Sequence, residues 1–199
     1  MTKTIDYYFT PLSPWAYMGH DRFVSMARKA GAHVNVKPVD YGRIFPVSGG
    51  LPLAQRPKQR QAYRMTELAR WRDFLGLSAM NLKPKHTPVP TEPACRLIIA
   101  ADLKDLNALA LAGFIGKAVW EEERDISDPE TLKTIAAEHG RNAKLLWETA
   151  QGEATKTAYD SYTQEAIDRQ VFGAPTYVYR DELFWGQDRL DFLERALAK

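Results

Sequence analysis

The chain has 199 residues, of which 45% are hydrophobic and 26% are charged, and its formal net charge is +2. A chain of this length and composition buries a substantial core, which excludes a disordered protein, and it has no apolar run near the roughly 18 residues that span a bilayer. The small net charge is a weak electrostatic footprint for nucleic acid, so we expect neither a nucleic acid nor a membrane as partner.

The first forty residues alternate between strand and helix patterns. Residues 5–9 are rich in strand formers, two prolines break the strand within residues 10–14, and apolar residues at helical spacing follow as far as Gly31. Residues 33–37 then alternate like a second strand. A helix between two strands predicts a parallel pair joined by a right-handed crossover.

The middle of the chain lacks strand patterns. We expect a loop from residue 42, rich in proline and glycine, followed by a series of helices up to residue 169. Strand patterns return at residues 176–179 and 183–185, which predict an antiparallel hairpin before a last helix. This order predicts an α/β fold in which residues 1–42 and 170–199 form one discontinuous domain and residues 43–169 form an all-helical insertion.

Basic residues concentrate in the first of these inserted helices. Glu67 is the one acid among six basic residues, namely Arg56, Lys58, Arg60, Arg64, Arg70 and Arg72. Such a stretch is either a solvated helix face or a surface that attracts an anionic ligand, and we favour the solvated face.

The single cysteine, Cys95, excludes an intramolecular disulfide and a multi-thiolate metal site, so we expect no metal. Cys95 falls in an apolar helical pattern, which indicates an inert core residue rather than a nucleophile. The chain enters its first strand pattern without an apolar segment of secretory type, and we therefore expect a cytoplasmic location.

Ser13 stands where the first strand pattern ends and the first helical pattern starts. Backbone N–H groups and the positive end of the helix dipole converge at such a point and stabilise an anion such as a thiolate, to which a serine hydroxyl adds a hydrogen bond. Taken alone, a helix N-cap is the simpler interpretation of Ser13. Nothing in the sequence places a histidine base beside it, although His20 lies two helical turns away.

Two other places offer ligand contacts. Pro175 opens a strand pattern, and a cis bond there would expose the backbone of Ala174 to a peptide-like ligand, although a trans bond is commoner. Gln187 and Asp188 open the last helical pattern, where they either cap the helix or bind an ammonium group of a ligand.

Together, residues 8–17 (YFTPLSPWAY), 172–176 (FGAPT) and 184–190 (FWGQDRL) resemble the DsbA-like superfamily. More narrowly, they are similar to the 2-hydroxychromene-2-carboxylate isomerases and the kappa-class glutathione transferases. The resemblance spans nearly the whole chain. It implies a thioredoxin-like fold with a large helical insertion, bound glutathione and a homodimer.

The resemblance also assigns roles by position. It implies that Ser13 hydrogen-bonds the glutathione thiolate, that Pro175 is the family's cis-proline, and that the backbone of Ala174 pairs with the cysteinyl unit. Gln187 and Asp188 match the positions that hold the γ-glutamyl end of glutathione.

The loop that precedes the basic stretch fits the family less closely. Lys58 falls near a family lysine in the glutathione pocket. Gly49 and Gly50 stand where relatives often have Gly-Asn, so the polarisation that the asparagine amide would supply has to come from other groups.

The activity implied by the resemblance is the glutathione-dependent interconversion of 2-hydroxychromene-2-carboxylate, a small aromatic oxo-acid substrate, with trans-o-hydroxybenzylidenepyruvate. It proceeds by reversible addition of the thiolate, bond rotation and elimination. One alternative is a kappa-type glutathione transferase or peroxidase, and another, favoured by Gly50, is a non-catalytic glutathione-binding thioredoxin-like module. A dithiol oxidoreductase is not expected, because Ala16 occupies the second cysteine position.

Overall fold

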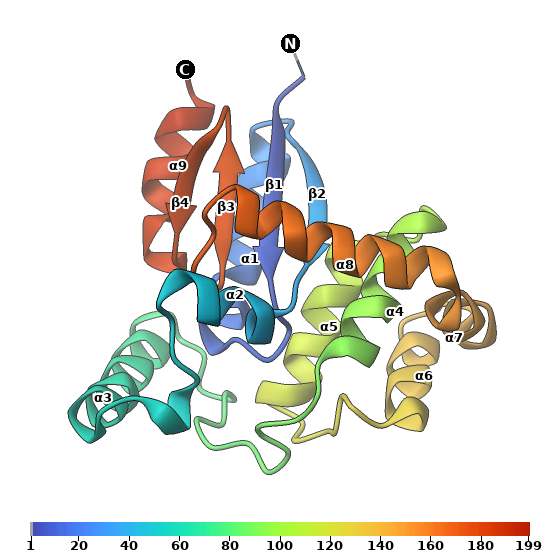
Figure 1. The fold of residues 1–199 in the computed structure, drawn as a ribbon, viewed down its shortest axis with the longest axis horizontal. Coiled ribbons are helices and arrows are strands. Elements are labelled where there is room, and N and C mark those ends of the chain that lie inside the picture. Colours follow the sequence, from blue (N-terminus) through green and yellow to red (C-terminus); the bar gives the residue numbers. More distant parts are fainter. Residues whose placement is uncertain (1) are drawn as a thin grey trace.

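A four-stranded mixed sheet in the order β2-β1-β3-β4 forms the centre of the molecule (Figure 1). The computed structural model describes residues 2–199. The strands are β1 (Thr4–Phe9), β2 (His33–Pro38), β3 (Thr176–Tyr179) and β4 (Glu182–Trp185). The helices are α1 (Pro14–Lys29), α2 (Tyr41–Ser48), α3 (Lys58–Phe74), α4 (Glu92–Leu103), α5 (Ala108–Trp120), α6 (Pro129–Glu138), α7 (Ala143–Gln151), α8 (Glu153–Asp168) and α9 (Leu190–Leu197), with short 3-10 helices η1 (Leu53–Gln55) and η2 (Gln187–Arg189).

The two ends of the chain build the sheet together. β1 and β2 pair in parallel and enclose α1, as the β-α-β pattern predicts. β3 pairs antiparallel with β1, with Tyr177 opposite Tyr7. β3 and β4 form the predicted hairpin, whose turn residues Arg180 and Asp181 have φ values of 51° and 62°, as a two-residue primed turn requires. The predicted α/β fold with helices inserted between β2 and β3 is confirmed.

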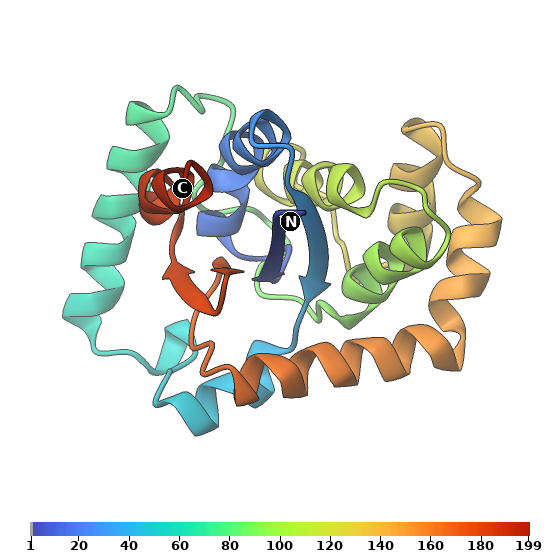
Figure 2. The ribbon, with the colours of Figure 1, turned by 90° about the horizontal axis from the view of Figure 1, so that it is seen from above.

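Helices cover both faces of the sheet. α1 and α9 lie on one face, and α2 and α8 lie on the other (Figure 2). The strand period of two distributes the β1 side chains accordingly: Tyr7 packs in the large core with α1, whereas Tyr8 packs in a smaller core with Ile44 of α2 and Ala166 of α8. Within residues 2–199, no helix is long and apolar enough to cross a bilayer.

The large core extends from the sheet into the inserted helices. Phe23 of α1, Ile98 of α4 and Ile115 of α5 are fully buried in the same cluster of apolar side chains as Tyr177 of β3. The inserted helices therefore support the sheet and α1 from the side. The division into two domains at residues 42 and 169 stays a prediction.

A charged cluster fastens α8 to the sheet. The Lys37 Nζ atom lies 2.7 Å from Oε1 of Glu165 and 3.0 Å from Oδ1 of Asp6, and Nη1 of Arg169 lies 3.1 Å from Oδ2 of Asp6. The Lys37 and Asp6 side chains are only 12% and 15% exposed, so water screens this cluster weakly. Because α8 leads into the segment before β3, the cluster fixes where that segment reaches the sheet.

The loop predicted from residue 42 is wrong in its first part, where α2 forms. The Asp40 side chain caps this helix by accepting a hydrogen bond of 2.7 Å from the Gly42 N–H. Ile44 is fully buried between the sheet and α8, and this burial outweighs the unfavourable Pro46. Gly49, in the left-handed region with φ of 74°, ends the helix.

Candidate functional site

Ser13 occupies the end of the loop that connects β1 to α1. It is 8% exposed, and its Oγ accepts a hydrogen bond of 3.2 Å from the Ala16 N–H, which confirms the N-cap interpretation. Pro14 holds the first helical position, and the first turn of α1 contains no acidic residue. The positive end of the α1 dipole is therefore not neutralised from within its own helix.

The segment before β3 meets α1 at Ser13. The Ala174–Pro175 peptide bond is cis. The Ser13 hydroxyl donates a hydrogen bond of 3.3 Å to the Ala174 carbonyl oxygen, which is long for an O–H···O contact. The Ala174 N–H forms no backbone hydrogen bond within residues 2–199. Ser13, Ala174 and Pro175 are thus brought together, with a spare backbone donor and a weakly held hydroxyl.

Three hydrogen bonds fix this segment. The Tyr41 hydroxyl of α2 donates to the Gly173 carbonyl at 2.9 Å, and the Thr176 hydroxyl donates to the same carbonyl at 2.7 Å. The Gly186 N–H donates to the Pro175 carbonyl at 2.8 Å, which joins the segment to the turn before η2. The unpredicted helix α2 therefore has a direct part in positioning the site.

η2 lies next to this segment, and its two predicted ligand residues, Gln187 and Asp188, differ in exposure and in their partners. Gln187 is 1% exposed, and its Oε1 accepts a hydrogen bond of 2.9 Å from Nη1 of Arg22, so this oxygen already has a partner. The Asp188 side chain is 38% exposed, and its Oδ2 lies 3.1 Å from Nη1 of Arg189. Asp188 is thus the one of the two with a carboxylate open to a ligand, and neither side chain caps α9.

A cavity of about 580 Å³ opens between η2 and the helix α3. Its walls combine tryptophans with several arginines. They are formed by Trp15, Arg56, Gln59, Arg60, Tyr63, Arg64, Glu67, Trp71, Ala174, Trp185, Gly186, Gln187, Asp188 and Arg189.

The predicted residues relate to this cavity in different ways. Ala174, Gln187 and Asp188 line it. Ser13 is not part of the lining but is hydrogen-bonded to Ala174, which is. Lys58 is exposed at the first residue of α3 and is not part of the wall. Gly50 also lies outside the wall; a Cβ atom there would be 2.4 Å from Cδ1 of Phe45, so an asparagine at this position would require Phe45 to move.

One wall of the cavity, formed by α3 and the residue Arg56 before it, was not predicted as part of the site. Arg56, Arg60 and Arg64 line the cavity, which favours the alternative of a surface that attracts an anionic ligand, whereas Arg72 pairs with Asp73 outside the wall and fits a solvated face. The sequence feature that indicates this wall is the basic stretch itself. Sequence periodicity could not distinguish a polar helix face toward water from one toward a cavity.

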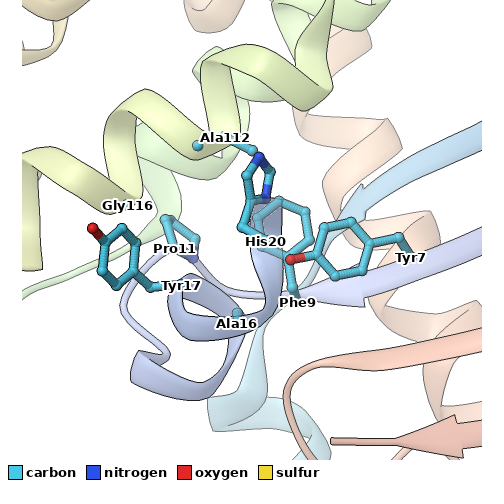
Figure 3. A pocket seen from close by; sticks show the side chains of 9 residues that line it. Tyr7, Phe9, Pro11, Ala16, Tyr17, His20, Ala112 and Gly116 are labelled. Atoms are coloured by element: carbon cyan, nitrogen blue, oxygen red, sulfur yellow. The ribbon is translucent and has the colours of Figure 1, made fainter. Parts of the chain in front are cut away.

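A second void, of about 10 Å³, lies between α1 and α5 (Figure 3). Tyr7, Phe9 and His20 gather at one end of it and Tyr17 at the other. A volume of this size holds at most one water molecule, which excludes it as a substrate site.

His20, which lines this void, is 7% exposed, and burial lowers the pKa of its imidazole despite the opposing charge of Asp21. The unfolded chain then binds a proton at a pH where the folded chain does not, so the free energy of unfolding falls as the pH drops below about 6.5. We expect His20→Asn to flatten this dependence, measured as urea unfolding at several pH values. His33→Asn, at an exposed histidine, should keep it; an unchanged slope in His20→Asn would contradict the assignment.

The one cysteine is remote from this chemistry. Cys95 of α4 is fully buried, and burial raises the pKa of its thiol to about 12. A thiol that stays protonated and inaccessible is not a nucleophile, so a thiolate at Ser13 has to come from a ligand.

The comparisons with known proteins agree with this geometry. The family model described as a DSBA-like thioredoxin domain matches residues 4–198. A 2-hydroxychromene-2-carboxylate isomerase from Sphingobium xenophagum is 30% identical over 203 residues, covering 99% of both chains. A solved structure of 2-hydroxychromene-2-carboxylate isomerase has a TM-score of 0.75 at 26% identity and covers 98% of this chain and 94% of that chain. Human glutathione S-transferase kappa 1 is 22% identical, over 100% of this chain and 92% of the human protein.

Proposed function

The chain belongs to the DSBA-like thioredoxin family, and from that premise we propose that it is a glutathione-dependent isomerase of the 2-hydroxychromene-2-carboxylate type. The relatives named as isomerases support the reaction class, and the human kappa relative supports glutathione as the cofactor. We also propose that the protein acts in the cytoplasm as a homodimer.

The observation that carries the proposal is the meeting of Ser13 with the Ala174–Pro175 backbone beside an open cavity, in a chain whose one thiol is buried. The donor set fits glutathione. The Ala174 N–H is a free donor for the peptide-like cysteinyl unit, and the Asp188 carboxylate suits the α-ammonium group of the γ-glutamyl end.

When bound, glutathione supplies a thiolate, which is both a strong nucleophile and a good leaving group. Ser13 prepares the site for that negative charge. Its hydroxyl accepts from the Ala16 N–H and donates to the Ala174 carbonyl through a long contact. A ligand N–H that takes this carbonyl frees the hydroxyl to donate to sulfur. The first backbone N–H groups of α1 add the positive end of the helix dipole at the same place.

The cavity wall provides for the oxo-acid. Trp15, two residues after Ser13, lines the same cavity and offers an apolar surface for a planar ring. With Gly50 outside the wall, the positive charge that polarises a substrate carbonyl comes from the arginines that line the cavity. These arginines replace the polarising role of the asparagine amide found in relatives, so the proposed function does not require that amide.

A kappa-type transferase is the second candidate, and the human relative favours it. Both activities use the same Ser13 site, but a transferase or peroxidase consumes glutathione whereas an isomerase does not. A non-catalytic glutathione-binding module would bind glutathione without turning over a conjugated ketone.

We expect purified protein to interconvert 2-hydroxychromene-2-carboxylate and trans-o-hydroxybenzylidenepyruvate only when glutathione is present. Ultraviolet absorbance follows the interconversion, and a thiol assay on the same samples measures glutathione. Interconversion with constant glutathione supports the isomerase. Loss of glutathione with an electrophile supports the transferase, and binding without any turnover supports the module.

A further inference from the structure

The α3 wall of the cavity carries more positive charge than its neighbours neutralise. Two carboxylates line the cavity, and each already pairs with an arginine: Glu67 lies 2.6 Å from Nη1 of Arg70, and Asp188 lies 3.1 Å from Arg189. In residues 2–199, no carboxylate lies within ion-pairing distance of the remaining cations of the wall, which are Arg56, Arg60 and Arg64.

These arginines also repel one another. Burial and the charge of Arg56 lower the pKa of Arg64, and burial and the charge of Arg60 lower the pKa of Arg56. The Nε of Arg56 donates a hydrogen bond of 2.8 Å to the Leu51 carbonyl, which ties Arg56 to the loop. Arg60 and Arg64 form no such hydrogen bond within the described part of the chain, so their guanidinium groups are free to bind an anion.

The spacing along α3 sets the shape of a ligand that fits this wall. Arg60, Arg64, Glu67 and Trp71 recur every three or four residues and therefore lie on one face of the helix. All four line the cavity, and Trp71 also packs against the large core, which holds its ring in place at the end of this face. Adjacent arginines and tryptophans suit a planar ring that carries a carboxylate.

We propose that the α3 wall is a second subsite, beside the glutathione site, for an aromatic carboxylate whose carboxylate binds Arg60 and Arg64 and whose ring lies against Trp71 and Trp15. The inference rests on the proposed function, because it requires glutathione at Ser13. It names the residues that select an anionic over a neutral aromatic substrate. The competing anion for the same arginines is the glycyl carboxylate of glutathione itself.

Two glutathione derivatives separate these anions. S-Benzylglutathione and S-(4-carboxybenzyl)glutathione share every glutathione group and differ by one carboxylate on the ring. We expect calorimetry to show that the unmodified protein binds the carboxylated derivative at least about tenfold more tightly. In the double variant Arg60→Gln, Arg64→Gln, this preference should disappear, whereas the affinity for S-benzylglutathione should stay within about twofold.

Arg72→Gln is the matched control, because it removes an arginine of α3 that pairs outside the cavity, and it should keep the preference. The single variants Arg60→Gln and Arg64→Gln should each lose part of the preference, which provides the test if the double variant does not fold. No preference in the unmodified protein would overturn the subsite. Equal weakening of both derivatives in the variant would assign the arginines to glutathione and overturn it as well. If neither derivative nor glutathione binds the unmodified protein, the proposed function itself fails.

Discussion

Replacing Ser13 by alanine is expected to lower glutathione-dependent isomerisation by about 10²–10³-fold and to leave the fold intact, which is the effect of removing one preorganised donor from a site of developing negative charge. The Ser13 hydroxyl lies at the N-terminus of α1 and donates to the Ala174 carbonyl, so it is placed to donate to a thiolate bound there. Without it, the dipole of α1 alone stabilises the thiolate, so the pKa of the bound glutathione thiol should rise. Steady-state rates and a pH titration of thiolate absorbance measure the two effects.

The same substitution also removes a helix cap, because the Ser13 Oγ accepts from the Ala16 N–H. Loss of such a cap lowers the free energy of unfolding by about 0.5–2 kcal/mol. Asp128→Ala is the matched control, since Asp128 caps α6 by accepting a 2.8 Å hydrogen bond from the Thr131 N–H, away from the cavity. It should lose comparable stability and keep full activity. Equal activity in Ser13→Ala and the unmodified protein would reject the role of Ser13.

The sheet and its flanking helices could be predicted because their sequence patterns are local. The β-α-β start and the hairpin follow from periodicity and turn residues. The family motifs predicted that Ser13 and Ala174 lie together, and a hydrogen bond joins them, whereas their roles toward a ligand stay predictions. The cis state of the Ala174–Pro175 bond, which statistics alone disfavour, followed from the resemblance.

Helix α2 could not be predicted, because its stability is not local. Pro46 and the two glycines after it are typical of a loop, and what overrides them is the burial of Ile44 against Tyr8 and Ala166. These contacts join segments that are far apart in the sequence. For the same reason no local pattern indicates that the hydroxyl of Tyr41 holds the segment before β3.

The surroundings of the charged face of α3 also could not be predicted from the sequence. A run of arginines has the same pattern whether its helix face meets water or a ligand cavity, and only the position of η2 opposite α3 decides between them. Lys58, the cation predicted in the pocket, lies outside the cavity lining, whereas Arg60 and Arg64, two and six residues further along, line the cavity. Whether Lys58 contacts glutathione stays a prediction.

The position of η2 itself depends on Gly19, in the middle of α1. A Cβ atom on Gly19 would lie 2.6 Å from the Cβ and 3.4 Å from the Cα of Gln187, so α1 and η2 approach too closely for any other residue. Gly19→Ala should therefore displace η2, and with it Asp188. In a helix interior alanine is favoured over glycine by about 1 kcal/mol, but overpacking of this kind destabilises by about 1–3 kcal/mol.

In Gly19→Ala, the free protein relieves the clash by moving η2. Part of the overpacking energy should therefore appear as a lower affinity for glutathione. Returning Asp188 to the ligand restores the clash, so we expect Gly19→Ala to weaken glutathione binding by about tenfold or more, measured by calorimetry. Gly113→Ala is the matched control: its Cβ would lie 2.7 Å from Nε2 of His20, beside the small void between α1 and α5. That variant overpacks the contact between α1 and α5 but leaves η2 in place, so it should change the free energy of unfolding and bind glutathione normally. Equal losses of affinity in the two variants would mean that general destabilisation, and not the position of η2, weakens the site.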